Sequence, residues 1–370
     1  MRRLLLISCL VLLAVTNMFA DKPNFVWHNP WNEDFIVVNG LAFPEECRGT
    51  YQRIGQVHKD EIPDYVWENS YYSAGLTIRF HSNSPSITIR YKCASDQFGM
   101  NHMPATGTSG LDLYARDSQG HEMLCMASYH FGETCSYTYE GLVYKDPARD
   151  GYDYEVFLPM YNLVTWMEIG VPEGYDFHFL EAEKEKPIMV YGTSIAHGGC
   201  SSRPALGWTN IVKRTLNMPL INWGFSGSGR LDASVFELMA KVDASLYIID
   251  CMPNMVYASE EVIIDKLVKG VHILRAAGNA PILVVEHDGC VCDETNDGER
   301  ASYERVNAAC LKGFRQLQEE GVKELYYLSH DEIDMHPDGQ VDGCHSNDIG
   351  MMCYAKAYVA KIKSIFYLNH

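Results

Sequence analysis

After its first twenty residues, the sequence lacks any stretch of about 18 consecutive apolar residues, the length that a membrane-spanning helix needs. At the start of the chain, Arg2 and Arg3 precede a shorter apolar run, Leu4–Val15, and Ala20 follows soon after. A basic start, a short apolar run and a small residue before the cut are the layout of a secretory signal. We therefore expect residues 1–20 to be removed on export to the periplasm or the extracellular space, with no membrane insertion of the mature chain.

Positive charge is also scarce. The chain has 30 Lys and Arg residues against 48 Asp and Glu residues, which gives a formal net charge of −18 at pH 7. A surface this acidic repels the phosphates of nucleic acids and of anionic membranes. We therefore expect no nucleic-acid partner, whereas an uncharged polymer such as a polysaccharide is compatible with the charge.

The 12 cysteines contain no paired C-x-x-C knuckles, the spacing of a structural zinc site. Loss of Cys9 with the signal leaves an odd number, which in an exported protein requires a free thiol or an intermolecular disulfide. The others are scattered over long segments, so we expect most of them to be buried as small apolar residues and predict no metal site. Whether a disulfide forms near Cys290 and Cys292 is left undecided by the sequence.

Residues 21–183 alternate apolar and polar residues in short runs, such as Leu76–Phe80, Ser86–Tyr91 and Tyr154–Leu158. Segments rich in Ser, Asn, Pro and Gly separate these runs, and no long helical pattern interrupts them. Many short strands with this punctuation are typical of a β-sandwich or jelly roll. We expect an all-β, jelly-roll-like sandwich domain over residues 21–183.

After a charged junction the pattern changes to strands that alternate with helices, over residues 187–370. The expected strands are Ile188–Tyr191, Leu220–Trp223, Ser245–Asp250, Pro281–Glu286 and Glu324–Leu328, and the expected helices are 206–216, 234–241, 260–277, 299–321 and 347–366. Such alternation predicts an α/β domain whose parallel sheet is covered by helices on both faces. Ligands of these domains bind at the carboxyl ends of the strands, so we expect the site there.

Residues with useful chemistry follow the ends of these strands. Ser194, Gly227 and Asn254 come after the first, second and third strands, and Asp342-x-x-His345 follows the fifth. A serine nucleophile needs a base, a carboxylate that orients the base, and hydrogen-bond donors for the oxyanion. Ser194, His345 and Asp342 meet the first three needs. The N–H groups of Ser194 and Gly227 and the amide of Asn254 meet the fourth.

Each of these residues alone has an ordinary structural interpretation. A serine after Gly-Thr is common in turns, and an Asp–His pair on a loop is often a surface hydrogen bond. Gly227 can simply permit a tight turn, and Asn254 can cap the following segment. Their joint occurrence at successive strand ends favours the catalytic interpretation.

Other candidates fit the chemistry less well. Ser226 lies in Gly-Phe-Ser-Gly, but Ser228 stands where a full G-x-S-x-G nucleophile elbow has its last glycine. His197 is so close to Ser194 in sequence that base geometry is hard to reach. His287, at the end of the fourth strand, fits a pocket-lining role and a structural role equally well.

Together these blocks resemble the SGNH (GDSL-like) hydrolase superfamily, whose name records a Ser, a Gly, an Asn and a His from four separate blocks. Two blocks depart from the better-known enzymes: Ser194 lies in Gly-Thr-Ser-Ile, and Asn254 lies in Cys-Met-Pro-Asn. The resemblance implies an SGNH/flavodoxin-like three-layer α/β/α domain with a Ser194–His345–Asp342 triad. It also implies an oxyanion hole made by Ser194, Gly227 and Asn254.

The first half contains Gly110-Leu-Asp112-Leu-Tyr114, preceded by His102-Met-Pro104. This segment resembles the G-x-D-L-Y domain that precedes some bacterial SGNH hydrolases, which is expected to be a β-sandwich. The two resemblances together cover nearly all of the mature chain. Two roles of the first domain stay open: it either only packs against the catalytic domain or also supplies loops that wall the substrate cleft.

An exported two-domain arrangement of this kind resembles bacterial carbohydrate esterases. We therefore expect hydrolysis of acyl esters, acetyl esters of carbohydrates in particular, with an acylated small molecule or polysaccharide as substrate and no cofactor. Trp208, Trp223 and Tyr257 are candidates for sugar stacking, although aromatic residues also fill cores. Lipid or thioester hydrolysis at the same site, and a non-catalytic carbohydrate-binding protein, stay open as alternatives. The sequence leaves the polymer, the acyl group and the oligomeric state undetermined.

Overall fold

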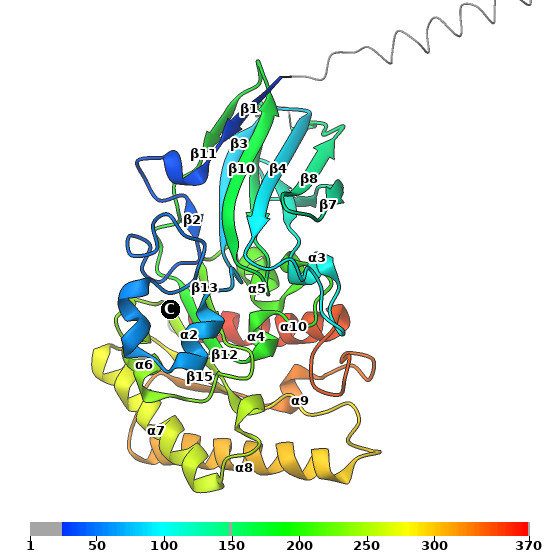
Figure 1. Ribbon diagram of the computed structural model, residues 1–370. Helices are drawn as coiled ribbons and strands as arrows, with labels where there is room; N and C mark the ends of the chain where they lie inside the picture. Colours follow the sequence, from blue (N-terminus) through cyan, green and yellow to red (C-terminus); the bar gives the residue numbers. More distant parts are fainter. Residues whose placement is uncertain (1–23, 147, 149, 369–370) are drawn as a thin grey trace, which may run out of the picture.

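The computed structural model describes residues 24–146, 148 and 150–368, so the predicted export signal lies outside the described residues. Two regions follow each other along the chain, a β region and then an α/β region (Figure 1). None of the described helices has both the length and the apolar character that are required to cross a membrane.

The first region consists of two antiparallel sheets. One sheet has the strand order β1 (Phe25–His28), β10 (Val164–Pro172), β4 (Ser86–Cys93), β8 (Cys135–Glu140), β7 (Ala127–His130). The other has the order β11 (Phe177–Phe179), β3 (Thr77–Ser82), β9 (Tyr152–Phe157), β5 (Asp112–Arg116), β6 (Glu122–Leu124), and β2 (Val38–Asn39) also pairs with β3. The expected all-β sandwich is confirmed.

Alternation of side chains builds the core of this sandwich. On β4, Ile87, Ile89 and Tyr91 are fully buried, while the residues between them lie partly exposed on the other face. Successive side chains of a strand point to opposite faces, so one face of each sheet is available to pack against the other sheet. The same region also contains helices α2 (Asp64–Ser70) and α3 (Ala105–Thr108) and the 3₁₀ helices η2 (Pro30–Asn32) and η3 (Gln56–Glu61), which the sequence did not predict.

The second region has a parallel sheet with the strand order β13 (Leu220–Gly224), β12 (Ile188–Gly192), β14 (Leu246–Asp250), β15 (Ile282–Val285), β16 (Leu325–Leu328). The helices are α5 (Trp208–Leu216) and α10 (Asp348–Leu368) on one face and α6 (Ala233–Met239), α7 (Glu260–Ala277) and α8 (Asp297–Glu319) on the other. The first three strands in sequence are buried along their whole length, as a sheet covered on both faces requires. The expected three-layer α/β/α domain is confirmed.

Short elements connect these strands and helices. They are α4 (Ser194–His197), η4 (Pro204–Leu206), η5 (Met252–Met255) and α9 (His330–Ile333). The first expected helix, over residues 206–216, starts later, at Trp208, because the 3₁₀ turn and Gly207 come before it.

The strand order positions the site. The chain leaves β12 to form β13 on one side and then crosses to form β14 on the other, which makes β12 the point where the strand order reverses. Ligands bind outside the carboxyl ends of the strands at such a point. The register places Gly192 opposite both Gly224 and Asp250, so the three strands end level with one another. Segments that follow these three residues therefore begin at the same edge.

The G-x-D-L-Y segment joins the two regions. Asp112 accepts a hydrogen bond of 2.7 Å from the N–H of Ala205 and pairs with Arg203 at 3.1 Å. Arg203 also donates to the hydroxyl of Tyr114 at 3.0 Å. Asp112 is 6% exposed, so its charge is neutralised within the junction rather than by solvent. The structure thus gives this motif a docking role between the regions.

Candidate active site

Ser194, His345 and Asp342 form a hydrogen-bonded line. His345 Nε2 lies 2.8 Å from Ser194 Oγ, and His345 Nδ1 lies 2.8 Å from Asp342 Oδ2. Ser194 is the first residue of α4 and stands two residues after the end of β12, whereas the other two lie in the loop between α9 and α10. The serine and the histidine are 151 positions apart in the chain, so the fold alone brings them together.

One turn of the loop orients the histidine. Asp342 Oδ1 accepts the N–H groups of His345 at 2.8 Å and of Cys344 at 3.1 Å, while its other oxygen faces the imidazole. Partial burial acts to raise the pKa of Asp342, but the hydrogen bonds from His345 and Cys344 outweigh it and lower that pKa. Asp342 is therefore an anion at neutral pH and favours the imidazole tautomer that carries its proton on Nδ1.

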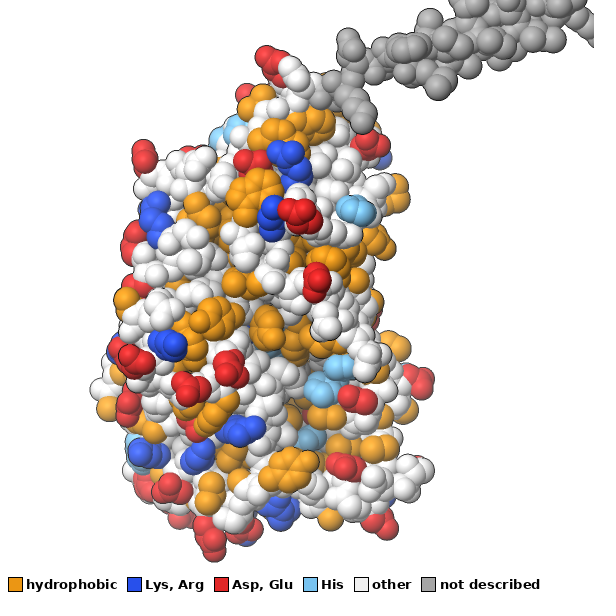
Figure 2. All heavy atoms as spheres, in the orientation of Figure 1, with side chains coloured by type: hydrophobic (Ala, Val, Ile, Leu, Met, Phe, Trp, Pro, Cys, Tyr) orange, Lys and Arg blue, Asp and Glu red, His pale blue; other side chains and the backbone are white. Residues whose placement is uncertain are grey.

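The three side chains differ in their exposure. Ser194 is 6% exposed, whereas the side chains of His345 and Asp342 are 26% and 42% exposed. The hydroxyl is therefore sheltered from bulk water, and the imidazole can still be reached by a substrate. Histidine side chains gather in the middle of the face that Figure 2 shows.

Two backbone N–H groups in and near the Ser194 turn have no hydrogen-bond partner among the described residues. Neither the N–H of Ser194 nor that of Gly227 donates to another group in the part of the chain that the structure describes. Ser194 is at the first position of its helix, where the N–H has no partner within the helix. Gly227 has a φ of +67° with open space around its Cα, so glycine is required there by backbone conformation rather than by crowding.

Asn254 contacts the same turn from η5. The donors around its side chain orient the amide: its oxygen accepts the N–H of Ser228 at 3.2 Å and of Gly229 at 3.1 Å. This orientation turns the NH2 group away from those two donors, so it is able to donate elsewhere. The structure thus joins the glycine and asparagine blocks directly, beside the strand end that carries Ser194.

The alternative histidines have other partners. His197 is fully buried, its Nε2 lies 2.6 Å from the carbonyl of Met160, and its ring stacks on Tyr161 at 4.2 Å. Burial, with the nearby Arg53 charge, lowers the pKa of His197 well below its usual value. It is a neutral packing residue that contacts Met160 rather than the hydroxyl of Ser194. His287 is also buried, and its Nδ1 accepts the N–H of Gly289 at 3.0 Å.

The aromatic candidates divide into two groups. Trp208 and Trp223 are fully buried, and Trp208 stacks on Tyr358 at 4.0 Å. Of the two roles that the sequence left open for these tryptophans, the structure shows core packing, because they fill the cores on either side of the parallel sheet. Tyr257 is fully exposed.

Two residues of the first region, Arg53 and Tyr161, support the site without having been predicted. The guanidinium of Arg53 is fully buried and donates only to backbone carbonyls, those of Asn69, Tyr72, Asn222 and Gly224, at 2.6 to 3.0 Å. The last two belong to β13, the strand that leads into the Gly227 turn. The hydroxyl of Tyr161 donates to the carbonyl of Ser194 at 3.2 Å. No motif marks either residue, because each acts through a contact with a distant part of the chain.

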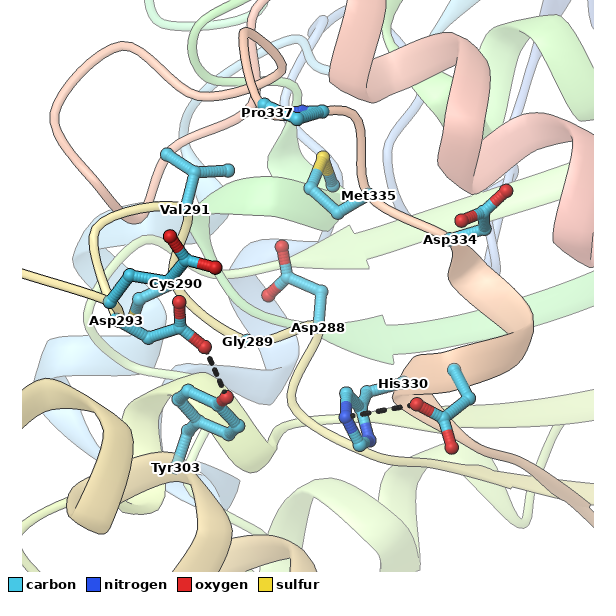
Figure 3. Close-up of a pocket in the computed structure, with 12 residues that line it drawn as sticks. Asp288, Gly289, Cys290, Val291, Asp293, Tyr303, His330, Asp334, Met335 and Pro337 are labelled. Carbon is cyan, nitrogen blue, oxygen red and sulfur yellow. Dashed lines mark hydrogen bonds and ion pairs between the residues drawn. The ribbon is translucent and has the colours of Figure 1, made fainter.

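A cavity of about 420 Å³ lies next to the loop that carries His345 (Figure 3). Asp288, Cys290, His330 and Met335 help to line it, but Ser194 and His345 do not. Gln340 ties its wall to the loop, with hydrogen bonds to Asp288 Oδ2 at 3.0 Å and from the N–H of Val291 at 2.9 Å. The wall of the cavity therefore supports the loop that carries the histidine.

The described residues contain no group of three or more His, Cys, Asp and Glu side chains that could hold a metal ion. Cys290 and Cys292 are present as free thiols.

The chain matches two family models. Residues 185–363 match the GDSL-like lipase/acylhydrolase family, and residues 25–177 match the N-terminus of SGNH hydrolase-type esterases. The chain belongs to the SGNH (GDSL-like) hydrolases. The family resemblance inferred from the sequence motifs is thereby confirmed.

Several solved structures resemble this SGNH hydrolase over nearly its whole length. A protein from Bacteroides ovatus described as a GDSL-like lipase has a TM-score of 0.84 and 27% identity, covering 93% of this chain and 98% of its own. The salicylyl-acyltransferase SsfX3 from a tetracycline biosynthetic pathway has a TM-score of 0.72 and 17% identity, covering 92% and 97%. A family two carbohydrate esterase from Cellvibrio japonicus has a TM-score of 0.56 and 12% identity, covering 94% and 100%. The last two likenesses show the fold alone. No curated protein matches the chain.

The two departures from the better-known SGNH blocks leave the arrangement intact. Thr193, the residue before Ser194, caps α4 by accepting the N–H of Ile195 on its hydroxyl at 3.3 Å. Asn254 follows Pro253 and still contacts the turn of the glycine block. Both local contacts are therefore made despite the altered neighbours.

Proposed function

We propose that this SGNH hydrolase is an exported serine esterase that removes acetyl groups from carbohydrates without a cofactor. The observation that carries the proposal is the line from Ser194 through His345 to Asp342, with 2.8 Å at each step. That spacing is within the range needed for direct proton transfer between hydroxyl and imidazole.

In the first step, Ser194 Oγ attacks the ester carbonyl while His345 Nε2 accepts the hydroxyl proton. The imidazolium formed is stabilised by the Asp342 anion. His345 then gives the proton to the leaving alkoxide as the tetrahedral intermediate collapses to an acyl-enzyme. Water, activated by the same imidazole, attacks the acyl-enzyme and releases the acid and free Ser194.

The negative charge that develops on the carbonyl oxygen needs donors. We assign this role to the N–H groups of Ser194 and Gly227 and to the NH2 of Asn254. The first two have no partner among the described residues, and the third is oriented by the turn that carries Gly227. Donors already in place when charge forms lower the barrier, and loss of one such donor typically costs ~3 kcal/mol.

Two observations support the proposed substrate class: the net charge of the chain and its likeness to a solved carbohydrate esterase. A net charge of −18 disfavours anionic ligands and is compatible with an uncharged glycan. The structure from Cellvibrio japonicus, which shares this two-region fold, is described as a carbohydrate esterase. The export step rests on the basic and apolar pattern of residues 1–20, and sequencing the N-terminus of the secreted protein would test it.

The proposal is tested by comparing wild type with Ser194→Ala on p-nitrophenyl acetate. Loss of the nucleophile predicts a fall in kcat of roughly 10⁴-fold or more. Ser226→Ala is the matched variant, because Ser226 follows the neighbouring strand and has no histidine partner among the described residues; its activity should stay close to wild type. Equal activity of Ser194→Ala and wild type would refute the esterase.

Two further measurements define the substrate. A series of p-nitrophenyl esters from acetyl to octanoyl should show a steep fall in kcat/KM with chain length. A rise toward octanoyl would favour a lipid hydrolase at the same site. Release of acetate from a panel of acetylated polysaccharides would then identify the polymer.

A further inference from the structure

An exposed histidine of the first region lies beside His345. His102 is at the tip of a two-residue turn between Met100 and Met103, whose backbones pair through hydrogen bonds of 2.9 and 3.2 Å. Its ring centroid is 5.7 Å from that of His345, and the ring planes are inclined by 48°. Neither ring nitrogen of His102 has a hydrogen-bond partner among the described residues. The imidazole is therefore free to bind a ligand.

The segment that carries His102 is docked on the segment that follows the nucleophile. The hydroxyl of Thr106 donates to the carbonyl of Ser202 at 2.7 Å. Gly107 lies so close to Ser201 that an added Cβ would be 2.3 Å from the Ser201 carbonyl oxygen, so only glycine allows this approach. The backbone at the base of the turn is thus fixed to the catalytic region.

Residues 200–202 also bind the start of the last helix, α10, close to His345. Ser202 donates its N–H and its hydroxyl to the carboxylate of Asp348 at 2.7 and 2.6 Å. The N–H of Cys200 donates to the carbonyl of Ser346, the residue after His345, at 2.7 Å. The segment that carries His102 and the segment that carries His345 are therefore both hydrogen-bonded to residues 200–202. This shared attachment holds the two histidines side by side.

The chemistry of the reaction says what occupies the space next to His345. The imidazole must deliver its proton to the leaving oxygen from hydrogen-bond distance, about 3 Å. The alcohol half of the ester therefore lies against His345. A hydroxyl one or two carbons beyond the leaving oxygen comes within reach of an imidazole whose ring centre is 5.7 Å from that of the base.

We propose that His102 is a specificity-determining residue that binds a hydroxyl on the alcohol half of the substrate. The site would then select esters of polyols, such as O-acetylated sugars, over esters of simple alcohols. Neutral imidazole suits this role because it offers one donor and one acceptor, and a sugar hydroxyl can use both. This inference rests on the proposed esterase function, and it makes a turn of the sandwich one wall of the substrate cleft.

The test uses two esters with the same acyl group and a similar ring, mono-O-acetylated glucose and cyclohexyl acetate. In His102→Ala, loss of one neutral hydrogen bond predicts a fall in kcat/KM of about tenfold for the sugar ester. The value for cyclohexyl acetate should stay close to that of wild type. His102→Gln keeps a donor and an acceptor and should recover part of the preference. His178→Ala, which changes an exposed histidine of β11, is the control and should alter neither value.

Either of two results would overturn the proposal. No change on either ester would mean that His102 does not contact the substrate. An equal fall on both esters, with a shifted pH profile on cyclohexyl acetate, would mean that His102 acts through His345 instead. Failure of the esterase function itself would look different, because wild type would then show no Ser194-dependent hydrolysis of either ester, and the role of His102 would fall with it.

Discussion

The two regions of the molecule contribute to the site by different physical means. In the α/β region, Ser194, Gly227 and Asn254 follow three neighbouring strands whose backbone register ends them level. The sandwich region contacts the same site through turns and single side chains, such as Arg53 on the carbonyl of Gly224 and His102 beside His345. Backbone pairing thus positions the residues that we propose to react, whereas side-chain contacts between the regions hold their surroundings. Variants that separate loss of chemistry from loss of stability test this division.

The largest effect is expected from a pair of histidine variants. His345→Ala should lower kcat by about 10⁴-fold with little change in Tm, because it removes the base from an exposed loop. His197→Ala should instead lower the free energy of unfolding by about 3 kcal/mol, because it empties a buried stacked position. Steady-state kinetics and thermal unfolding of both variants separate the loss of catalysis from the loss of stability. A stable but inactive His197→Ala beside an active His345→Ala would reverse the assignments.

Arg53 tests the side-chain support from the sandwich. Arg53→Leu removes the donor from two buried carbonyls, those of Asn222 and Gly224, and from two partly buried ones, which should cost at least about 3 kcal/mol of stability. Arg48→Leu is the matched control: Arg48 also donates to backbone carbonyls, but its side chain is 36% exposed and water can replace it. Tm measured by circular dichroism should fall several degrees only in Arg53→Leu. Equal shifts in the two variants would contradict a special role for the buried guanidinium.

Asp250, at the end of β14, gives a smaller and pH-dependent effect. Burial raises its pKa to about 7, the nearby Asp288 adds to this, and a hydrogen bond from Tyr358 opposes it. The folded protein therefore holds a proton that the unfolded chain loses above pH 4, so stability falls as pH rises from about 4 to 7. Asp250→Asn removes this titration. Its Tm should exceed that of wild type more at pH 8 than at pH 5, and a pH-independent difference would refute the raised pKa.

Much of the α/β region was predictable because its rules are local. Five short apolar runs with helices between them specify a covered parallel sheet, and a parallel sheet collects the segments after its strands at one edge. Ser194 and Asn254 could be found because they stand two and four residues beyond register-matched positions, Gly192 and Asp250. Only their joint placement made them informative, since each residue type is common in turns.

The contributions of the sandwich could not be predicted in the same way. Arg53 binds carbonyls 169 and 171 positions away, and a lone arginine carries no sequence signal for such contacts. The histidine of His102-Met-Pro104 was visible as part of a family motif, but its proximity to His345 depends on how two regions dock. The role of the tryptophans stayed open for a related reason: Trp223 lies on the buried strand β13 and Trp208 packs from the start of α5 against Tyr358 of α10, and the second contact is not visible in the sequence.

The most direct test of the account is to find which residue a serine-directed fluorophosphonate modifies. The structure predicts a single adduct on Ser194 by peptide mass mapping, with its formation slowed strongly in His345→Ala because the hydroxyl then lacks its base. An adduct on Ser226 or on any other residue, or labelling of Ser194 at an unchanged rate without His345, would contradict the central claim.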